Sequence, residues 1–268
     1  MKFIHMTDLH LPSPGDRLFG LDPFERAGRC LDDIARWHAD AEFCVISGDL
    51  AEKGGGDAYR WLAERLKGFP MRAIVMIGNH DDREALCAAF PEARRDGAGF
   101  LQSALSTSQG TFLFLDTYKG EGSAGTYCAV RREWLDGQLR AARGRPVWMF
   151  MHHPPFEVGM PYMDRIRMEE SDAFAEVLSG HTNIRHIFFG HIHRACYVNW
   201  NGISCTSLPG TNHQLPLVRE AVATSYSVEP PMYGVVRIGD RQTTIHFDAC
   251  LDRKAADMPP RSDKPAAG

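Results

Sequence analysis

The sequence lacks a hydrophobic run long enough to cross a bilayer, and its first residues lack the apolar core and cleavage site of a secretory signal. It also lacks clusters of basic residues. The 30 Lys and Arg are spread along the chain and, with 34 Asp and Glu, give a formal charge of −4. These absences predict a cytoplasmic protein that binds neither a membrane nor a nucleic-acid polymer.

Paired cysteine motifs are absent as well. The seven cysteines are an odd number and show no Cys-x-x-Cys spacing. Cys30, Cys44 and Cys205 lie among apolar residues, so we interpret them as small core side chains. A reducing compartment is expected, although the sequence leaves one disulfide open.

What the sequence does contain is one pattern that recurs five times: an apolar strand, a sharp exit, and then Asp, Asn or His. Predicted helices separate most of these strands, and the first of them begins with Asp22 as N-cap and Pro23 as its first residue. In α/β domains, ligands gather at the end of the sheet where the strands release their loops. The strands are predicted over 2–7, 42–47, 72–77, 146–151 and the stretch ending at Phe189, and the helices over 23–38, 57–66, 131–142 and 169–178.

The C-terminal region has a different texture. Asn201-Gly202 lies between two strand-like runs and strongly favours a two-residue hairpin turn, and a second hairpin is predicted near Gly239-Asp240-Arg241. We therefore divide the chain into a core over 1–194, a region of cap and core-completing hairpins over 195–251, and a tail over 252–268 that its composition predicts to be disordered.

The polar residues at the five strand ends form a mixed nitrogen and oxygen set without a thiolate. Such a set excludes a structural thiolate zinc site and suits Fe, Mn, Zn or Co in a catalytic role. Each cluster alone has a structural alternative, since Asp8 can form a turn, Asn79 can cap a helix and His152 can be a loop residue before proline. All five alternatives together are improbable. The set comprises Asp8, His10, Asp49, Asn79, His80, His152, His191 and His193.

These motifs resemble those of the calcineurin-like binuclear metallophosphoesterases, and the resemblance covers residues 1 to about 216. Two further stretches are similar to the branch of class III cyclic-nucleotide phosphodiesterases and bacterial glycerophosphodiesterases, namely 151–155 and 208–214. The motifs themselves are Asp8-x-His10, Gly48-Asp49, Gly78-Asn79-His80-Asp81, His152 and Gly190-His191-x-His193.

The resemblance implies a fold and a role for each residue. The fold is an α+β, four-layer αββα sandwich with a small C-terminal β-hairpin cap. Two divalent or trivalent transition-metal ions are implied, one held by Asp8, His10, Asp49 and His193 and the other by Asp49, Asn79, His152 and His191. His80 then faces the phosphate, and Asp81 orients the His80 ring through its second nitrogen. His153 and His213 match outer positions near the substrate.

The implied activity is hydrolysis of small phosphodiesters, cyclic nucleotides or glycerophosphodiesters, by a hydroxide that bridges the two metals. The same branch implies a homodimer or a larger homo-oligomer. Two alternatives are a phosphomonoesterase of the same superfamily and a scaffold that has lost its metals. Against them, the run from Gly48 to Gly54 departs from the Gly-Asp-x-x-Asp-Arg-Gly pattern of protein phosphatases, and no ligand position is broken. The loop with His213, and Tyr197 and Trp200 before it, are expected to cover the site.

Overall fold

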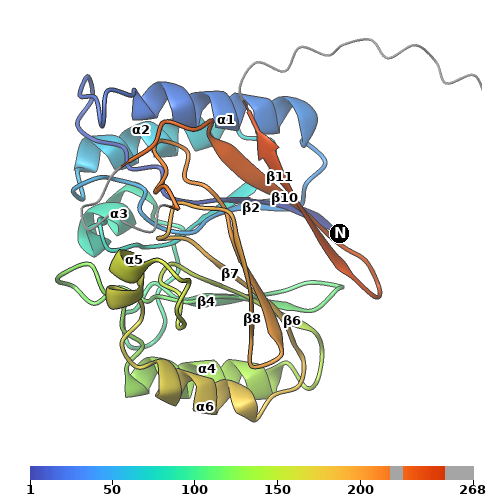
Figure 1. The fold of residues 1–268 in the computed structure, drawn as a ribbon. Helices are drawn as coiled ribbons and strands as arrows, with labels where there is room; N and C mark the ends of the chain where they lie inside the picture. Colours follow the sequence, from blue (N-terminus) through green and yellow to red (C-terminus); the bar gives the residue numbers. More distant parts are fainter. Residues whose placement is uncertain (218–225, 251–268) are drawn as a thin grey trace, which may run out of the picture.

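A computed structural model describes residues 1–217 and 226–250. Two β-sheets lie face to face at its centre, and helices cover their outer faces (Figure 1). One sheet has the strand order β11-β10-β1-β2-β3, and the other has the order β4-β5-β6-β7-β9-β8. The strands of the first are β1 (Lys2–Met6), β2 (Phe43–Ile46), β3 (Arg72–Val75), β10 (Met232–Ile238) and β11 (Thr243–Ala249). Those of the second are β4 (Ser103–Ser106), β5 (Thr111–Phe114), β6 (Val147–Met151), β7 (Ile184–Phe189), β8 (Cys196–Trp200) and β9 (Ile203–Ser207).

The helices form the two outer layers. In Figure 1, α1 and α2 lie over the first sheet, and α4 and α6 lie over the second. This confirms the four-layer αββα sandwich. The helices are α1 (Pro23–Trp37), α2 (Gly56–Lys67), α3 (Arg83–Ala89), α4 (Ala129–Ala141), α5 (Pro161–Arg165) and α6 (Ser171–Ser179).

Alternation along the central strands explains why they are apolar throughout. Phe3 of β1 packs between the sheets, where its ring stacks on Phe43 at 5.1 Å and meets the edge of Phe188 at 5.5 Å. Ile4 and Met6 of the same strand belong to the core beneath the helices. A strand buried on both faces needs apolar residues at successive positions, not at every second one.

Parallel pairing brings the carboxyl ends of the key strands together. β1, β2 and β3 run parallel in one sheet, and β5, β6, β7 and β9 run parallel in the other.

The predicted start of α1 is confirmed: Asp22 caps it by accepting a hydrogen bond from the Glu25 amide at 3.1 Å, and Pro23 is its first residue.

Several local predictions are wrong. The helix predicted over 57–66, for which the sequence offers Asp57 as N-cap, is instead capped at Gly55, and Asp57 lies inside the first turn and contacts Arg60. The short helix α5 was not predicted. Cys30 is buried but is not a lone core thiol, because it forms a disulfide with Cys250, whose Cα atom lies 5.5 Å away.

The two C-terminal hairpins extend the sheets. β9 pairs with β7 and carries β8 at the edge, whereas β10 pairs with β1 and carries β11. Asn201 and Gly202 have φ values of 52° and 82°, as the predicted hairpin turn requires. The parts of this region that reach the polar strand ends are the loop from Leu208 to Leu215 and Tyr226. The predicted tail over 252–268 lies outside the described residues. No helix among the described residues is long and apolar enough to cross a membrane.

Candidate metal centre

The exits of β1, β2, β6 and β7, with the loop after β3, converge on one edge of the sandwich. They bring together all seven residues predicted as metal ligands, and only Asn79 among them is not fully buried. Because the strands belong to both sheets, neither sheet alone presents the complete set. The seven are Asp8, His10, Asp49, Asn79, His152, His191 and His193.

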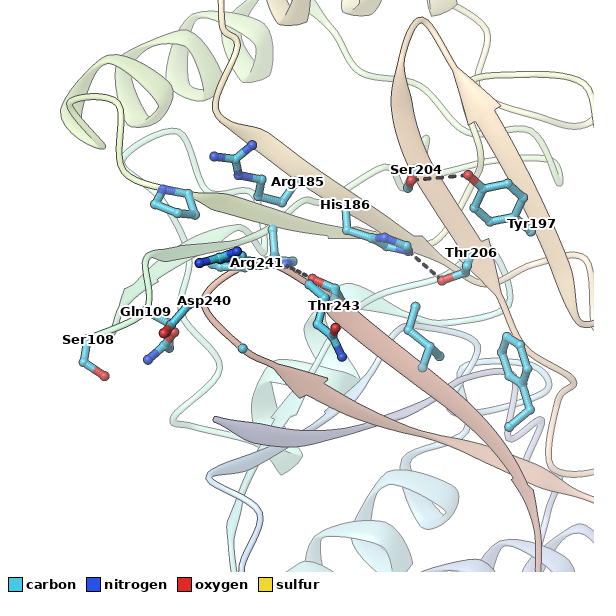
Figure 2. Close-up of a pocket in the computed structure, with 16 residues that line it drawn as sticks. Ser108, Gln109, Arg185, His186, Tyr197, Ser204, Thr206, Asp240, Arg241 and Thr243 are labelled. Atoms are coloured by element: carbon cyan, nitrogen blue, oxygen red, sulfur yellow. Dashed lines mark hydrogen bonds between the residues drawn. The ribbon is translucent and has the colours of Figure 1, made fainter. Parts of the chain in front are cut away.

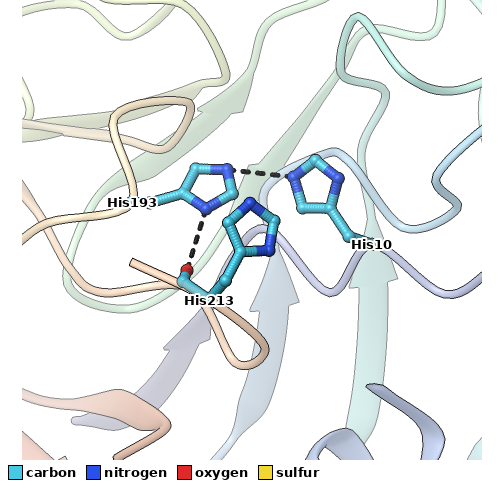
Figure 3. A group of neighbouring side chains, drawn as sticks. All are labelled: His10, His193 and His213. Carbon is cyan, nitrogen blue, oxygen red and sulfur yellow. Dashed lines mark hydrogen bonds between the residues drawn. The ribbon is translucent and has the colours of Figure 1, made fainter. Parts of the chain in front are cut away.

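A first group consists of Asp8, His10, Asp49 and His193, whose ligand atoms all lie within 4.8 Å of one another. The Nε2 atoms of His10 and His193 are 2.9 Å apart (Figure 3). Nε2 of His193 lies 3.4 Å from Oδ1 of Asp8, and Nε2 of His10 lies 3.5 Å from Oδ2 of Asp49. Such spacing is what ligands in one coordination shell show when each lies about 2 Å from the ion.

A second group, formed by Asp49, Asn79, His152 and His191, shares Asp49 with the first. Oδ2 of Asp49 lies 3.5 Å from His10 Nε2 and also 3.2 Å from His152 Nε2. The His152 ring is 5.2 Å from the ring of His191. One carboxylate oxygen therefore faces both groups, as a bridging ligand must.

Hydrogen bonds fix which ring nitrogen faces the centre. Nδ1 of His10 contacts the Glu52 carboxylate at 2.6 Å, and Nδ1 of His193 contacts the His213 carbonyl at 3.0 Å. Nδ1 of His152 contacts the Ser47 carbonyl at 2.9 Å. Each of these rings therefore donates through Nδ1 and presents the lone pair of Nε2. The Nε2 atoms of His10 and His193 thus face each other with lone pairs, which a cation between them would stabilise.

His191 is arranged in the opposite sense. Its Nε2 contacts the Ile166 carbonyl at 3.1 Å, which leaves Nδ1 for the centre.

Nε2 of His152 and Oδ1 of Asn79 are buried and have no hydrogen-bond partner among the described residues. Such atoms cost about 1–3 kcal/mol each when unsatisfied. Both are lone-pair donors, so the residues present fit a pair of transition-metal ions.

Five of the seven ligand residues have left-handed backbone. The φ values are 54° for Asp8, 47° for His10, 51° for Asp49, 70° for His191 and 48° for His193. This region is uncommon for residues other than glycine, and clusters of it are typical of functional sites. The sharp exits from β1, β2 and β7 turn the side chains inward over the strand ends.

Two glycines allow the strand exits to approach one another. A Cβ atom on Gly78 would lie 2.2 Å from Oδ1 of Asp49, and one on Gly190 would lie 2.1 Å from Oγ1 of Thr7 and 3.2 Å from Oδ2 of Asp8. A side chain at Gly78 would displace the Asp49 carboxylate, and one at Gly190 would displace Thr7 and crowd Asp8.

The electrostatics of the centre favour positive charge. Burial acts to raise the pKa of Asp49, but His152 and His10 hold it well below its usual value. Burial lowers the pKa of His152, yet Asp49 and Asp8 raise it to about 9, so the two carboxylates stabilise a positive charge at Nε2, either a proton or a metal ion in its place. Burial, with a neighbouring imidazole, lowers the pKa values of His10 and His191 well below the ordinary range, so both rings are neutral, as metal ligands must be.

Asp81 does not orient His80, which corrects the sequence-based expectation. The Asp81 carboxylate accepts hydrogen bonds from the amides of Leu50, Ala51 and Gly78 and from the Tyr59 hydroxyl, at 2.9–3.2 Å. It thereby ties the exit of β2 to the exit of β3. The partner of the His80 ring is instead Glu52, a residue the sequence did not single out.

Glu52 contacts two imidazoles of the site. Its carbonyl accepts from His80 Nδ1 at 2.9 Å, and its carboxylate lies 3.6 Å from that nitrogen and 2.6 Å from His10 Nδ1. The His80 amide also donates to Oδ1 of Asp49 at 2.9 Å. His80 lines the cavity above the centre, and its hydrogen bond to Glu52 uses Nδ1, not Nε2.

His213 lies beside the first group, as expected. Its ring is 4.4 Å from that of His193 and 5.0 Å from that of His10 (Figure 3). Burial and His193 lower its pKa to about 2. Nδ2 of Asn212 donates to His213 Nδ1 at 3.2 Å, which places the ring proton on Nε2.

The other residues expected near the substrate lie farther back. His153 is buried beside His191, with ring centroids 4.6 Å apart, and Thr117 contacts its Nδ1 at 2.8 Å. Trp200 packs against Phe156 in the core beneath the second sheet. Tyr197 lines a different cavity, which is described below. Neither of these hairpin aromatics lines the cavity at the centre, because their strand extends the sheet edge.

Two cavities lie at opposite ends of the strands. The one at the metal-ligand groups has a volume of about 80 Å³. The other has a volume of about 900 Å³ and is lined by Trp148, Arg185, His186, Tyr197 and the turn before β11 (Figure 2). It opens where β6 and β7 begin, so it is remote from the ligand residues that follow the strand ends.

Comparison with known proteins gives a family and several relatives. A family model described as calcineurin-like phosphoesterase matches residues 1–195. The chain is 38% identical to a probable cyclic nucleotide phosphodiesterase of Rhodopseudomonas palustris, over 92% of this chain and 91% of that protein. It is 26% identical to a glycerophosphodiester phosphodiesterase of Enterobacter lignolyticus, over 86% and 84%. A dimetal phosphatase from Danio rerio has a similar fold, with a TM-score of 0.71, 14% identity and coverage of 94% and 96%.

Proposed function

The chain belongs to the calcineurin-like phosphoesterase family, and from that membership and the geometry of its site we propose that it is a metal-dependent hydrolase of small phosphodiesters. The observation that carries the proposal is the position of Asp49, whose Oδ2 lies within 3.5 Å of ligand nitrogens in both groups. A single carboxylate between two sets of ligands is the arrangement that a binuclear centre requires.

The ligand set we propose keeps the assignment made from the sequence. Asp8, His10, Asp49 and His193 hold one ion, and Asp49, Asn79, His152 and His191 hold the other. When bound, the two ions supply an acidified water for attack on phosphorus and neutralise the charge on the phosphate oxygens. Nitrogen and oxygen donors of this kind suit Fe, Mn, Zn or Co. Metal analysis of the purified protein, followed by reconstitution with each ion, tests the pair.

His80 acts on the substrate, not on the metals, in this proposal. Glu52 engages Nδ1 of the ring, so Nε2 points into the cavity and can donate to a phosphate oxygen or to the leaving alkoxide. His213 presents an Nε2 proton beside the first group and can donate a second hydrogen bond. The two imidazoles approach the phosphate from different loops.

The substrate class is tested with a matched pair of esters. With both metals replete, kcat/KM for a bis-aryl phosphate should exceed kcat/KM for the matching mono-aryl phosphate. His213→Ala should reduce turnover while both metals stay bound. A clear preference for the monoester would overturn the diesterase proposal and leave the metal centre intact.

We also propose that the enzyme acts in the cytoplasm as a homodimer or larger homo-oligomer. Five described cysteines are unpaired, which suits a reducing compartment, whereas the Cys30–Cys250 disulfide is of a kind that is rare there. β8 and β11 are edge strands that offer unpaired backbone groups to a second copy. Light scattering on purified protein tests the assembly, and a monomer at micromolar concentration would count against it.

A further inference from the structure

The cavity above the metal-ligand groups is too small for a whole diester. Its volume of about 80 Å³ is well below the roughly 300–1,000 Å³ of sites that enclose a small organic ligand. A phosphate group fits at the ligand residues, but the organic group of a diester must lie at the mouth. The side chains at the mouth therefore decide which diesters bind well.

One side of the mouth is a tight turn that presents Phe19. Leu18 and Leu21 exchange two backbone hydrogen bonds, of 3.0 and 3.1 Å, across Phe19 and Gly20. Phe19 and Gly20 have φ values of 54° and 78°, as in a type I′ turn. A bulky aromatic residue rarely adopts this conformation, so the turn holds the ring in place at a cost in backbone strain.

The ring of Phe19 does not pack into the core. It is 43% exposed and stacks on Tyr226, which is 40% exposed, with centroids 3.7 Å apart and an angle of 26° between the planes. Both rings contact His213, with centroids 4.7 and 4.9 Å from its imidazole. Phe19 and Tyr226 thus form an aromatic platform that continues directly into the first ligand group.

The other side of the mouth is also apolar and aromatic. Tyr162 of α5 is 43% exposed and lines the same cavity, as do Met163 and Ile166. The Ile166 carbonyl holds His191, so this wall adjoins the second ligand group. Between these walls a flat ring would find aromatic faces, beside polar side chains such as Ser123 and His80.

We propose that the aromatic platform of Phe19 and Tyr226 is a binding subsite for a planar ring on the substrate. The inference rests on the proposed diesterase function and narrows it: the preferred substrates carry a nucleobase or aryl group, and cyclic nucleotides are favoured over glycerophosphodiesters. Stacking on aromatic side chains is tolerant of the ring's identity because every base has a π-face.

The variant Phe19→Asn removes the ring and keeps the turn, because Asn-Gly is a favoured pair for a type I′ turn. We expect the ratio of kcat/KM for 3′,5′-cyclic AMP to that for glycerophosphoethanolamine to fall about tenfold, which is within the range for loss of one stacking partner. Phe19→Tyr, which retains a ring, should keep the wild-type ratio. Bis-aryl phosphate as a third substrate separates recognition of any flat ring from recognition of a nucleobase.

A binding measurement makes the inference independent of hydrolysis. Calorimetry with AMP and with glycerol 3-phosphate should give tighter binding of AMP, and Phe19→Asn should weaken AMP binding about tenfold. If the wild type cleaves no diester but this loss of affinity is found, the platform stands and the proposed function fails. If diesters are cleaved but Phe19→Asn changes neither the ratio nor AMP binding, the platform is wrong.

Discussion

The two ends of the sandwich differ in cavity volume and, in the opposite sense, in backbone strain and unsatisfied buried atoms. The cavity where the strands begin has about ten times the volume of the one where they end, about 900 Å³ against about 80 Å³. Around the larger cavity, none of the described lining residues other than glycine has a positive φ, and His186 is satisfied by Thr206 at 2.8 Å. Around the smaller one lie five left-handed candidate ligand residues and several buried atoms without a hydrogen-bond partner, among them His152 Nε2 and Asn79 Oδ1.

The difference shows which end of the sandwich contains the destabilising features of the fold. Strained backbone and unsatisfied buried atoms persist only where something else compensates for them. The larger cavity has neither, and its charged residues Arg185 and Arg241 are exposed, which is the ordinary state of surface side chains. Chemistry is therefore expected at the small, strained end, and substitutions at the two ends can test that contrast.

Asp49→Ala should have the largest effect. Because Asp49 lies within 3.5 Å of ligand nitrogens in both groups, closer than Asp8 lies to His152, its loss should remove most bound metal and bring hydrolysis close to background. Metal content by mass spectrometry and turnover of a bis-aryl phosphate measure both. Asp240→Ala, which removes a carboxylate at the larger cavity, is the matched control and should retain both ions. Normal binding of two metals by Asp49→Ala would show that the bridge is assigned to the wrong residue.

His80→Ala should be the next largest. The ring is positioned to act on the phosphate, so turnover should fall by about a hundred- to ten-thousand-fold while both metals remain. Single-turnover kinetics on the metal-loaded variant measure the effect. Loss of metal here would mean that His80 is a ligand.

Glu52→Gln should have a smaller effect of a different kind. The carboxylate holds His10 Nδ1 at 2.6 Å, and replacing a residue that orients a ligand imidazole lowers metal affinity about 10- to 100-fold. Titration of the protein with a chelator measures that affinity. Glu64→Gln on the exposed face of α2 is the control. If the two variants compete equally with the chelator, Glu52 does not position His10.

Arg185→Ala and Arg241→Ala should have the smallest effect. Neither guanidinium makes an ion pair within the described part of the chain, and exposed substitutions of this kind change free energies by about 0.5 kcal/mol or less. Stability and kcat/KM should therefore stay within about twofold of the wild type. A tenfold loss of activity would assign a role to the larger cavity and break the contrast between the ends.

The ligand residues could be predicted because they follow local signals. A buried apolar run, a glycine or turn, and then Asp or His is visible in a dozen residues, and five repetitions imply a common edge. The placement of Asp81 was not predictable in the same way. Its four hydrogen-bond donors come from three segments, so the residue next to His80 in the chain belongs to a different network.

Contacts between distant segments account for the other differences. Glu52 and His10 follow different strands, β2 and β1, and Phe19 and Tyr226 lie near opposite ends of the chain, so no local pattern relates either pair. Cys30 and Cys250 are separated by 220 positions, and no spacing rule relates them. Packing across the chain, not local propensity, sets each of these pairs.

The pairing of β1 with β10 also sets an order of events during synthesis. β1 lies inside its sheet between β2 and β10, and the register joins Lys2 to Arg237. The ribosome has therefore made every proposed metal ligand before it makes β10, the strand that pairs with β1 just ahead of Asp8 and His10. Contacts between residues so far apart form late, because a long loop must close first. A nascent chain that ends soon after His193 would carry every proposed ligand without β10, so we expect metal loading to follow the emergence of the last hairpin from the ribosome.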